Sequence, residues 1–230
     1  MGIFSNMRKP KGKLGNIQLK SMNKEHTPLA LWNLKHLDIK PDDIVLDVGC
    51  GGGININRMA EKAKKVYGVD YSIESVKLSR EVNRDLIGQG KVEVLEGDVQ
   101  SLPFEDNTFD IITAFETVYF WPNIEKSFGE VKRVLKTGGT FMMGMESNGS
   151  DNIPMKISKK LIDMEVYSDD ELTGFLKAND YSNITVYLRD AKNREEIIKA
   201  NGEVKRIKDD YDHASFSDKF LEWMTITAEK

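Results

Sequence analysis

The chain has 230 residues, of which 40% are hydrophobic and 30% charged, and its formal net charge is −4. These values are typical of a single globular domain with a sizeable core, and they give no general reason to expect nucleic acid or an anionic membrane as a partner. No apolar run approaches a membrane-spanning length, and the first residues lack the apolar segment of a secretory signal. The single cysteine, Cys50, forms no internal disulfide, so we expect a reducing, cytoplasmic setting.

Residues 1–24 carry six basic side chains and no acidic one, which predicts a solvated basic arm. Contact with RNA is the alternative, but no aromatic residues are interleaved with the basic ones. Residues 25–38 have an amphipathic pattern with Pro28 early in it, and this predicts a helix that caps the domain. His26 opens that helix. It is either a solvent-facing helix-start residue or a contact to the substrate.

A strand, a tight glycine turn and a helix are predicted from Ile44 onward. Ile44–Val48 is a buried-strand pattern, glycines follow at 49, 51, 52 and 53, and apolar residues then recur at helical spacing over 54–64. Glycine lets a ligand lie against the backbone, and the first amide groups of a helix are free to bind an anion. Asp47 would repel a phosphate there but would suit an ammonium group or a hydroxyl. An amino-acid tail therefore fits this turn better than a dinucleotide, and we interpret Cys50 as a small turn residue rather than a catalytic thiol.

Two further predicted strands also end at acidic residues. The strand Val66–Asp70 closes with a carboxylate that could accept hydrogen bonds from ribose hydroxyls, or could merely cap the next turn. A helix is predicted over 73–87, and the strand 92–95 is followed by Asp98. Because the carboxyl ends of parallel strands meet at one edge of the sheet, Asp47, Asp70 and Asp98 are predicted to surround one ligand.

The fourth predicted strand, Phe109–Phe115, leads into Glu116 and an aromatic loop that contains Tyr119, Phe120 and Trp121. Glu116, Tyr119 and Trp121 are candidates for contact with a substrate, although the aromatic residues could equally pack beneath a cap. A helix from residue 122 or 123 and a strand over 140–145 are predicted next.

The C-terminal part contains a clear helix start and a charged tract. Ser168–Glu171 is a capping box for a helix to about residue 178, and 184–188 is a predicted strand. Residues 191–213 are rich in charge of both signs, which we interpret as an inserted surface helix. Trp223–Ala228 alternates and predicts a final strand beside 184–188.

Together these motifs resemble the class I S-adenosylmethionine-dependent methyltransferases, particularly the small-molecule branch related to ubiquinone and menaquinone methyltransferases. The resemblance implies an α/β, doubly wound, Rossmann-like sheet of seven strands whose last strand is antiparallel, with helices on both faces. The stretches that match, in the family's order, are Val45–Gly53, Gly68–Ser72, Glu96–Phe104, Phe109–Glu116 and Val134–Gly139.

The resemblance also implies S-adenosylmethionine as cofactor and a small molecule as methyl acceptor. We expect no metal. It implies that Asp70 holds the ribose and that Glu116 faces the substrate. The other implied cofactor contacts are Gly49 and Gly51 at the methionine moiety, Phe115 near its amine, and Tyr71, Asp98 and Val99 at the adenine. Asp47 is added to this set from its charge alone.

Three alternatives stay open at this stage. An NAD-dependent oxidoreductase shares the glycine turn, but its third glycine would fall at Ile54, and it leaves Asp47 and Asp98 unexplained. A non-catalytic S-adenosylmethionine-binding module would keep the same motifs. An RNA methyltransferase would use the basic arm, but we find no nucleic-acid surface. The acceptor, its reacting atom, the need for a general base and the oligomeric state are left undetermined.

Overall fold

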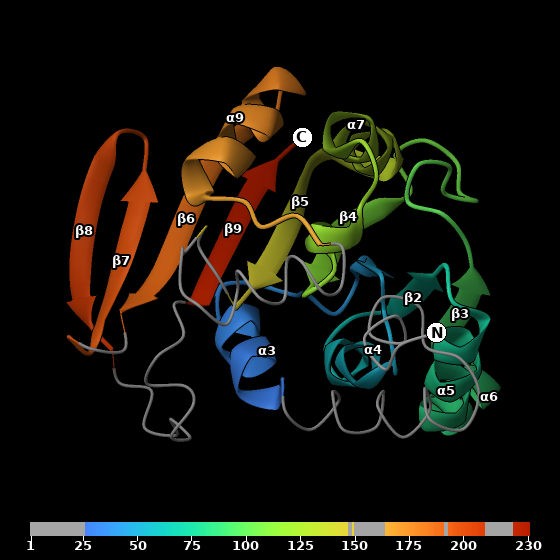
Figure 1. Cartoon of the computed structure of the whole chain (residues 1–230). Helices are drawn as coiled ribbons and strands as arrows, with labels where there is room; N and C mark the ends of the chain where they lie inside the picture. Colours follow the sequence, from blue (N-terminus) through green and yellow to red (C-terminus); the bar gives the residue numbers. More distant parts are fainter. Residues whose placement is uncertain (1–25, 147–148, 150–163, 191–192, 210–222) are drawn as a thin grey trace.

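The computed structural model describes residues 26–146, 149, 164–190, 193–209 and 223–230, which form one mixed sheet with helices on both faces (Figure 1). The strand order is β3-β2-β1-β4-β5-β9-β6-β7-β8. The strands are β1 (Ile44–Val48), β2 (Lys65–Asp70), β3 (Val92–Glu96), β4 (Phe109–Phe115), β5 (Leu135–Met145), β6 (Ser182–Asp190), β7 (Glu195–Ala200), β8 (Glu203–Lys208) and β9 (Trp223–Glu229).

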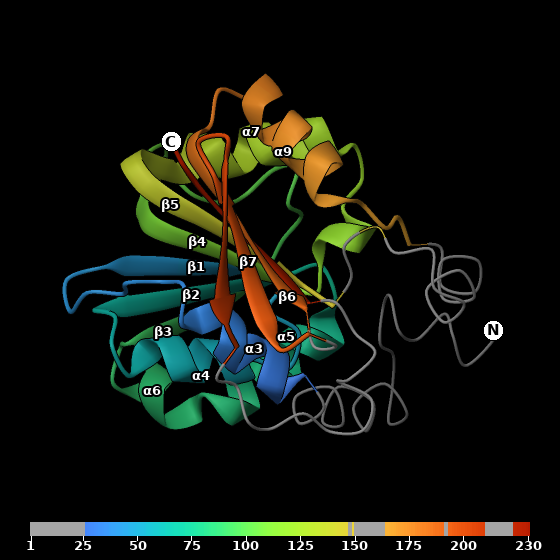
Figure 2. The same ribbon diagram turned by 90° about the vertical axis from the view of Figure 1, so that its left-hand side faces the viewer.

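Helices cover the sheet in two layers, which Figure 2 shows from the side. Val45 of β1 packs with Ile56 and other α4 residues, whereas Leu46 packs with Phe128 and other α7 residues. This alternation along a single strand separates two buried clusters, because successive side chains of a strand point to opposite faces. The helical segments are α3 (Thr27–Leu34), α4 (Ile54–Ala60), α5 (Ile73–Val82), α6 (Arg84–Gly88), the 3-10 turn η1 (Val118–Phe120), α7 (Ile124–Val134) and α9 (Asp169–Ala178).

The predicted doubly wound fold is confirmed. Strands β1 to β5 are parallel, so their carboxyl ends share one edge of the sheet. The last strand, β9, lies antiparallel between β5 and β6, as predicted. The sheet has nine strands rather than seven, because a hairpin of β7 and β8 extends it beyond β6.

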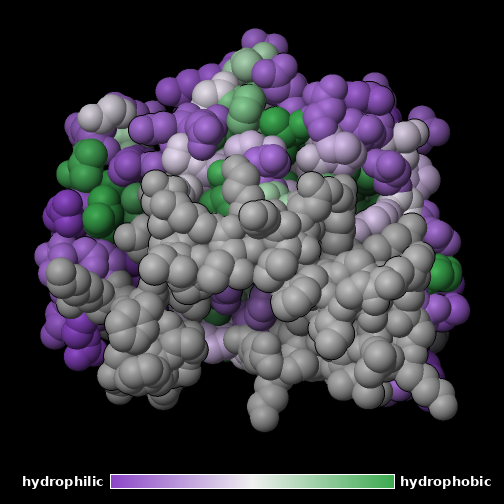
Figure 3. Space-filling model, viewed as in Figure 1, coloured by the Kyte–Doolittle hydropathy of each residue, from purple (hydrophilic) through white to green (hydrophobic). Residues whose placement is uncertain are grey.

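That hairpin corrects the surface helix predicted within 191–213. In the described part of this range, β7 and β8 pair antiparallel around Asn201–Gly202, whose φ angles are 51° and 80°. An Asn-Gly pair takes such left-handed angles readily and is the strongest short-range signal for a hairpin turn. The prediction of a helix gave the mixed charges of 191–213 more weight than this turn signal. Val204 and Ile207 of β8 are exposed, and Figure 3 shows hydrophobic side chains among mostly hydrophilic ones at this edge.

Helix ends differ more from prediction than strands do. The capping helix α3 spans only Thr27–Leu34, and α4 ends at Ala60. The helix predicted over 73–87 breaks at Asn83, whose Nδ2 donates to the carbonyls of Gly53 and Ser79, both at 2.9 Å. The capping box of α9 is confirmed.

The predicted basic arm, 1–24, lies outside the described residues. In the described part of the chain, no helix is long and apolar enough to cross a membrane.

Candidate functional site

A cavity of about 260 Å³ lies at the shared edge of the sheet, beyond the carboxyl ends of β1, β2, β3 and β4. Its walls include all eight residues predicted to contact the cofactor, together with His26, Glu116 and Trp121 from the predicted substrate side. The sequence pattern therefore brings these residues together as expected. The eight are Asp47, Gly49, Gly51, Asp70, Tyr71, Asp98, Val99 and Phe115.

The glycine turn forms the floor of this cavity. Gly49, Gly51 and Gly53 all have positive φ, at 76°, 50° and 77°. A Cβ atom at Gly53 would lie 2.8 Å from Cα of Ser79, so α4 and α5 can approach only because a side chain is missing. A Cβ at Gly51 would meet nothing within 4 Å among the described residues. The backbone at Gly51 is thus open on the cavity side, as close approach of a ligand requires.

Asp70 ties this turn to the end of β2. Its Oδ2 accepts from the Gly51 amide at 2.9 Å and its Oδ1 accepts from the Ser72 amide at 2.8 Å. Sequence reasoning treated a cap of the following turn as the alternative to a ligand contact. The carboxylate does bind that turn and also lines the cavity, and a carboxylate oxygen can accept more than one hydrogen bond.

Asp47 is a buried acid, 2% exposed, whose Oδ1 accepts from the Thr113 hydroxyl at 2.8 Å. Burial raises the pKa of Asp47 to about 7, and the nearby charge of Asp70 adds to the effect, while the Thr113 hydrogen bond opposes it. A positive group that entered the cavity would therefore favour ionisation of Asp47. By contrast, Asp98 is exposed, and its Oδ1 accepts from the Gln100 amide at 2.8 Å.

Glu116 is held in a strained backbone position at the end of β4. Its φ is 54°, and its amide donates to the Gly144 carbonyl of β5 at 2.9 Å. Oε1 of Glu116 accepts from the Glu146 amide at 2.6 Å and from the Tyr119 hydroxyl at 3.4 Å. Burial, together with the charge of Glu146, holds the pKa of Glu116 well above its ordinary range.

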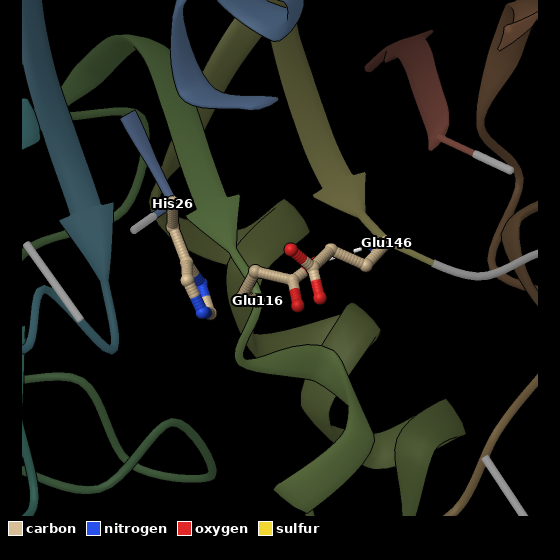
Figure 4. Close-up of side chains that lie close together, drawn as sticks. All are labelled: His26, Glu116 and Glu146. Atoms are coloured by element: carbon tan, nitrogen blue, oxygen red, sulfur yellow. Dashed lines mark hydrogen bonds between the residues drawn. The ribbon is translucent and has the colours of Figure 1, made fainter. Parts of the chain in front are cut away.

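Three titratable side chains meet where His26 and Glu116 line the cavity, and Glu146 lies just behind Glu116 without being a lining residue itself. Figure 4 shows the carboxyl groups of Glu116 and Glu146 next to each other with the His26 ring beside them, and one ligand atom from each lies within 4.8 Å of the others. Sequence reasoning selected His26 and Glu116 but missed Glu146. The signal for Glu146 was available, because it directly follows β5, which ends at the same edge as β4.

The aromatic loop divides between core and cavity. Trp121 and Phe120 line the cavity, and Trp121 donates from Nε1 to Oγ1 of Thr117 at 3.3 Å. Tyr119 is not among the described lining residues; it is buried in the core, and its hydroxyl donates to Glu116. Direct contact of Tyr119 with a substrate stays a prediction, and in this structure its hydroxyl supports Glu116.

Other residues of the site were not foreseen from sequence. Arg58 lines the cavity and donates to Oδ1 of Asn55 at 2.6 Å and to Oγ1 of Thr27 at 2.8 Å.

Cys50 is buried with a free thiol, and burial raises the pKa of that thiol. A thiol in this state is a poor nucleophile, which favours the interpretation of Cys50 as a small turn residue.

Most residues that line the cavity fall within a stretch that matches a known domain: residues 46–143 match the family model of the methyltransferase domain. This stretch carries a methyltransferase domain, and its relatives include proteins named as sterol methyltransferases. Over 109 residues the chain is 39% identical to sterol 24-C-methyltransferase erg6 of Schizosaccharomyces pombe, a match that covers 46% of this chain and 28% of that protein. The chain spans only 28% to 32% of the first curated relatives it matches.

Solved structures of methyltransferases share the whole fold. A S-adenosylmethionine-dependent methyltransferase from Aquifex aeolicus aligns with a TM-score of 0.65 at 20% identity, over 93% of this chain and 97% of that one. Phosphoethanolamine N-methyltransferase 2 of Haemonchus contortus, in complex with S-adenosyl-L-methionine, aligns with a TM-score of 0.74 at 17% identity. That alignment covers 99% of this chain and 60% of the other. Placement in the ubiquinone and menaquinone branch stays a prediction.

Proposed function

We propose that this chain binds S-adenosylmethionine in the cavity and transfers its methyl group to a small-molecule acceptor. One observation carries the proposal: the buried acid Asp47, the ribose candidate Asp70 and the adenine candidate Asp98 surround a single cavity whose glycine floor is open at Gly51. In a chain with this domain, that set matches an ammonium group, a ribose and an adenine in turn.

The residues present fit this cofactor on their own chemistry. Asp47 is a buried carboxylate with a raised pKa, and it suits the amino group of a methionine tail. Gly49 and Gly51 leave room for that tail, and Asp70 already has its two oxygens oriented by backbone amides. We assign the ribose hydroxyls to Asp70 and the adenine to Tyr71, Asp98 and Val99.

When bound, the cofactor supplies an electrophilic methyl group on a positively charged sulfur. The chain's residues would then act mainly by alignment and by excluding water. Phe120 and Trp121 form apolar wall at the acceptor side, and Glu116 is fixed by Glu146 and Tyr119. Good alignment alone can contribute roughly 7–11 kcal/mol to the lowering of a barrier. A general base is needed only if the acceptor atom carries a proton that must leave.

Two experiments test the proposal. Calorimetry with S-adenosylhomocysteine should give saturable one-to-one binding, whereas NADH fluorescence should be unchanged by the protein. Radiolabelled S-adenosylmethionine incubated with a metabolite extract should then give a labelled small product that mass spectrometry identifies. Absence of S-adenosylhomocysteine binding would refute the proposal, and binding without any labelled product would favour the non-catalytic module.

A further inference from the structure

We propose that the methyl acceptor is an amine, held as an ammonium ion between Glu116 and Glu146, and that Glu116 takes its proton. This inference rests on the proposed function, because it assigns the acceptor end of the same cavity. The observation behind it is the meeting of two carboxylates and an imidazole from three separate elements at one point.

The geometry suits a small cation with several N–H donors. His26 comes from the start of α3, Glu116 follows β4 and Glu146 follows β5. One imidazole nitrogen and one oxygen of each carboxylate lie within 4.8 Å of one another. An ammonium nitrogen donates at about 2.7–2.9 Å to each carboxylate oxygen. One such nitrogen can therefore bridge the two carboxylates, with the His26 imidazole as a third contact.

Charge makes a positive acceptor the best match. Two carboxylates side by side repel each other unless a proton or a cation lies between them. Arg58 is the one lysine or arginine among the described residues that line the cavity, and its guanidinium donates to Asn55 and Thr27. A neutral alcohol would bring no positive charge to the carboxyl pair, and an anion would be repelled by it. Phe120 and Trp121 add aromatic side chains to the lining, and aromatic rings attract cations.

The chemistry of an amine also requires what Glu116 offers. An ammonium ion has no lone pair, so one N–H bond must break before the nitrogen can react, with the electron pair staying on nitrogen. Oε1 of Glu116 already accepts from the Glu146 amide and the Tyr119 hydroxyl, so the proton passes to Oε2 and the carboxylate becomes a carboxylic acid. The freed pair then forms the N–C bond, while the C–S bond breaks and its electrons leave with sulfur.

Calorimetry of the full chain saturated with S-adenosylhomocysteine provides the first test. The probes are matched amine and alcohol pairs: benzylamine with benzyl alcohol, phenethylamine with phenethyl alcohol, and butylamine with butanol. We expect at least one amine to bind tenfold or more tightly than its alcohol. Glu146→Gln should reduce that preference about tenfold and leave S-adenosylhomocysteine affinity within twofold. Glu203→Gln, on the exposed strand β8, is the matched control and should change neither.

The outcomes separate this inference from the proposed function. Normal S-adenosylhomocysteine binding without an amine preference in any pair would overturn the amine assignment alone. Tighter binding of phenylacetate, or a Mn²⁺ site seen by electron paramagnetic resonance and lost in Glu146→Gln, would also overturn it and favour an anionic acceptor or a metal site. Failure to bind S-adenosylhomocysteine would instead refute the proposed function.

The proton-transfer role has its own readout. With an amine that the protein methylates, Glu116→Gln should lower kcat at least 100-fold, because a general base contributes typically 10²–10⁴-fold. Glu146→Gln should mainly raise KM. Equal effects of the two variants on kcat would remove Glu116 as the proton acceptor, and circular dichroism of both variants would verify that they fold.

Discussion

The two ends of the cavity are built in different ways. The proposed donor end centres on the glycine turn after β1, whose backbone Asp70 binds, and residues that follow β2 and β3 complete it. The proposed acceptor end combines His26, Glu116 and Glu146, which come from three elements far apart in the chain. Under the proposal, cofactor binding depends on one local turn and on neighbouring parallel strand ends, whereas acceptor binding also depends on how α3 docks on the domain.

Docking of α3 illustrates the second case, because this helix carries His26. The Thr225 hydroxyl of β9 donates to Oδ1 of Asn33 at 2.6 Å, and Lys35 pairs with Glu196 of β7 at 2.6 Å. The ring of His36 stacks on Tyr187 of β6, with centroids 3.9 Å apart. The C-terminal strands therefore hold one wall of the acceptor end, although none of these contacts touches the cavity's glycine floor.

The largest expected effect is at the donor end. Gly53→Ala should lower the free energy of unfolding by about 3 kcal/mol or more, because the position needs positive φ and the new methyl would overlap Ser79 of α5. Urea denaturation measures this. The control is Gly88→Ala in α6, where a Cβ meets nothing within 4 Å among the described residues and stability should change by less than about 1 kcal/mol. Equal losses in both variants would contradict the argument.

Asp70→Asn should weaken S-adenosylhomocysteine binding about 10- to 100-fold, since hydrogen bonds to a charged group contribute about 1.5–3 kcal/mol. Asn keeps one acceptor oxygen toward the glycine turn but loses the charge. Calorimetry measures the affinity, and Glu93→Gln on exposed β3 surface serves as the control. An unchanged affinity in Asp70→Asn would break the assignment of the ribose to this residue.

Glu196→Gln should affect the acceptor end but not the donor end. The Glu196 carboxylate pairs with Lys35, and its Oε1 lies 3.4 Å from Nε2 of His36. Because Lys35 is partly exposed, loss of this charge should lower the free energy of unfolding by about 1–2 kcal/mol. Amine affinity should fall while S-adenosylhomocysteine affinity stays constant. Glu195→Gln is the control: its partner Arg206 is exposed, so the free energy of unfolding should fall by less than about 0.5 kcal/mol. Equal weakening of both ligands would show that the two ends are coupled.

The smallest expected effect is a pH dependence at the donor end. In the unliganded fold the pKa of Asp47 is raised from its ordinary 3.8 to about 7, so this group should lower stability as pH rises between those values. An ammonium group beside Asp47 favours the ionised form, so binding should release a proton. S-adenosylhomocysteine affinity should then increase about tenfold from pH 6 to pH 8. Asp47→Asn should flatten this profile, and a flat profile for the unaltered chain would exclude the contact.

Much of the fold was predictable because its signals are local. The strand Ile44–Val48, the strand Phe109–Phe115 and the capping box at Ser168 follow from patterns within a few residues. The hairpin of β7 and β8 was predicted wrongly because its charge pattern was weighted above the Asn201–Gly202 turn. The break at Asn83 could not be predicted, because it depends on a bond to Gly53 in another helix–turn unit.

The sequence by itself determined the donor end: acids placed after consecutive parallel strands must gather at one edge, and glycines with positive φ must leave the backbone open. Only the tertiary structure decided that Glu146 joins His26 and Glu116, that Tyr119 supports Glu116 from the core, and that α3 rests on the C-terminal strands. The physical reason is the separation along the chain over which each kind of interaction acts. Backbone turns and strand alternation act between neighbours in the chain, whereas contacts between side chains from separate elements exist only after those elements have packed.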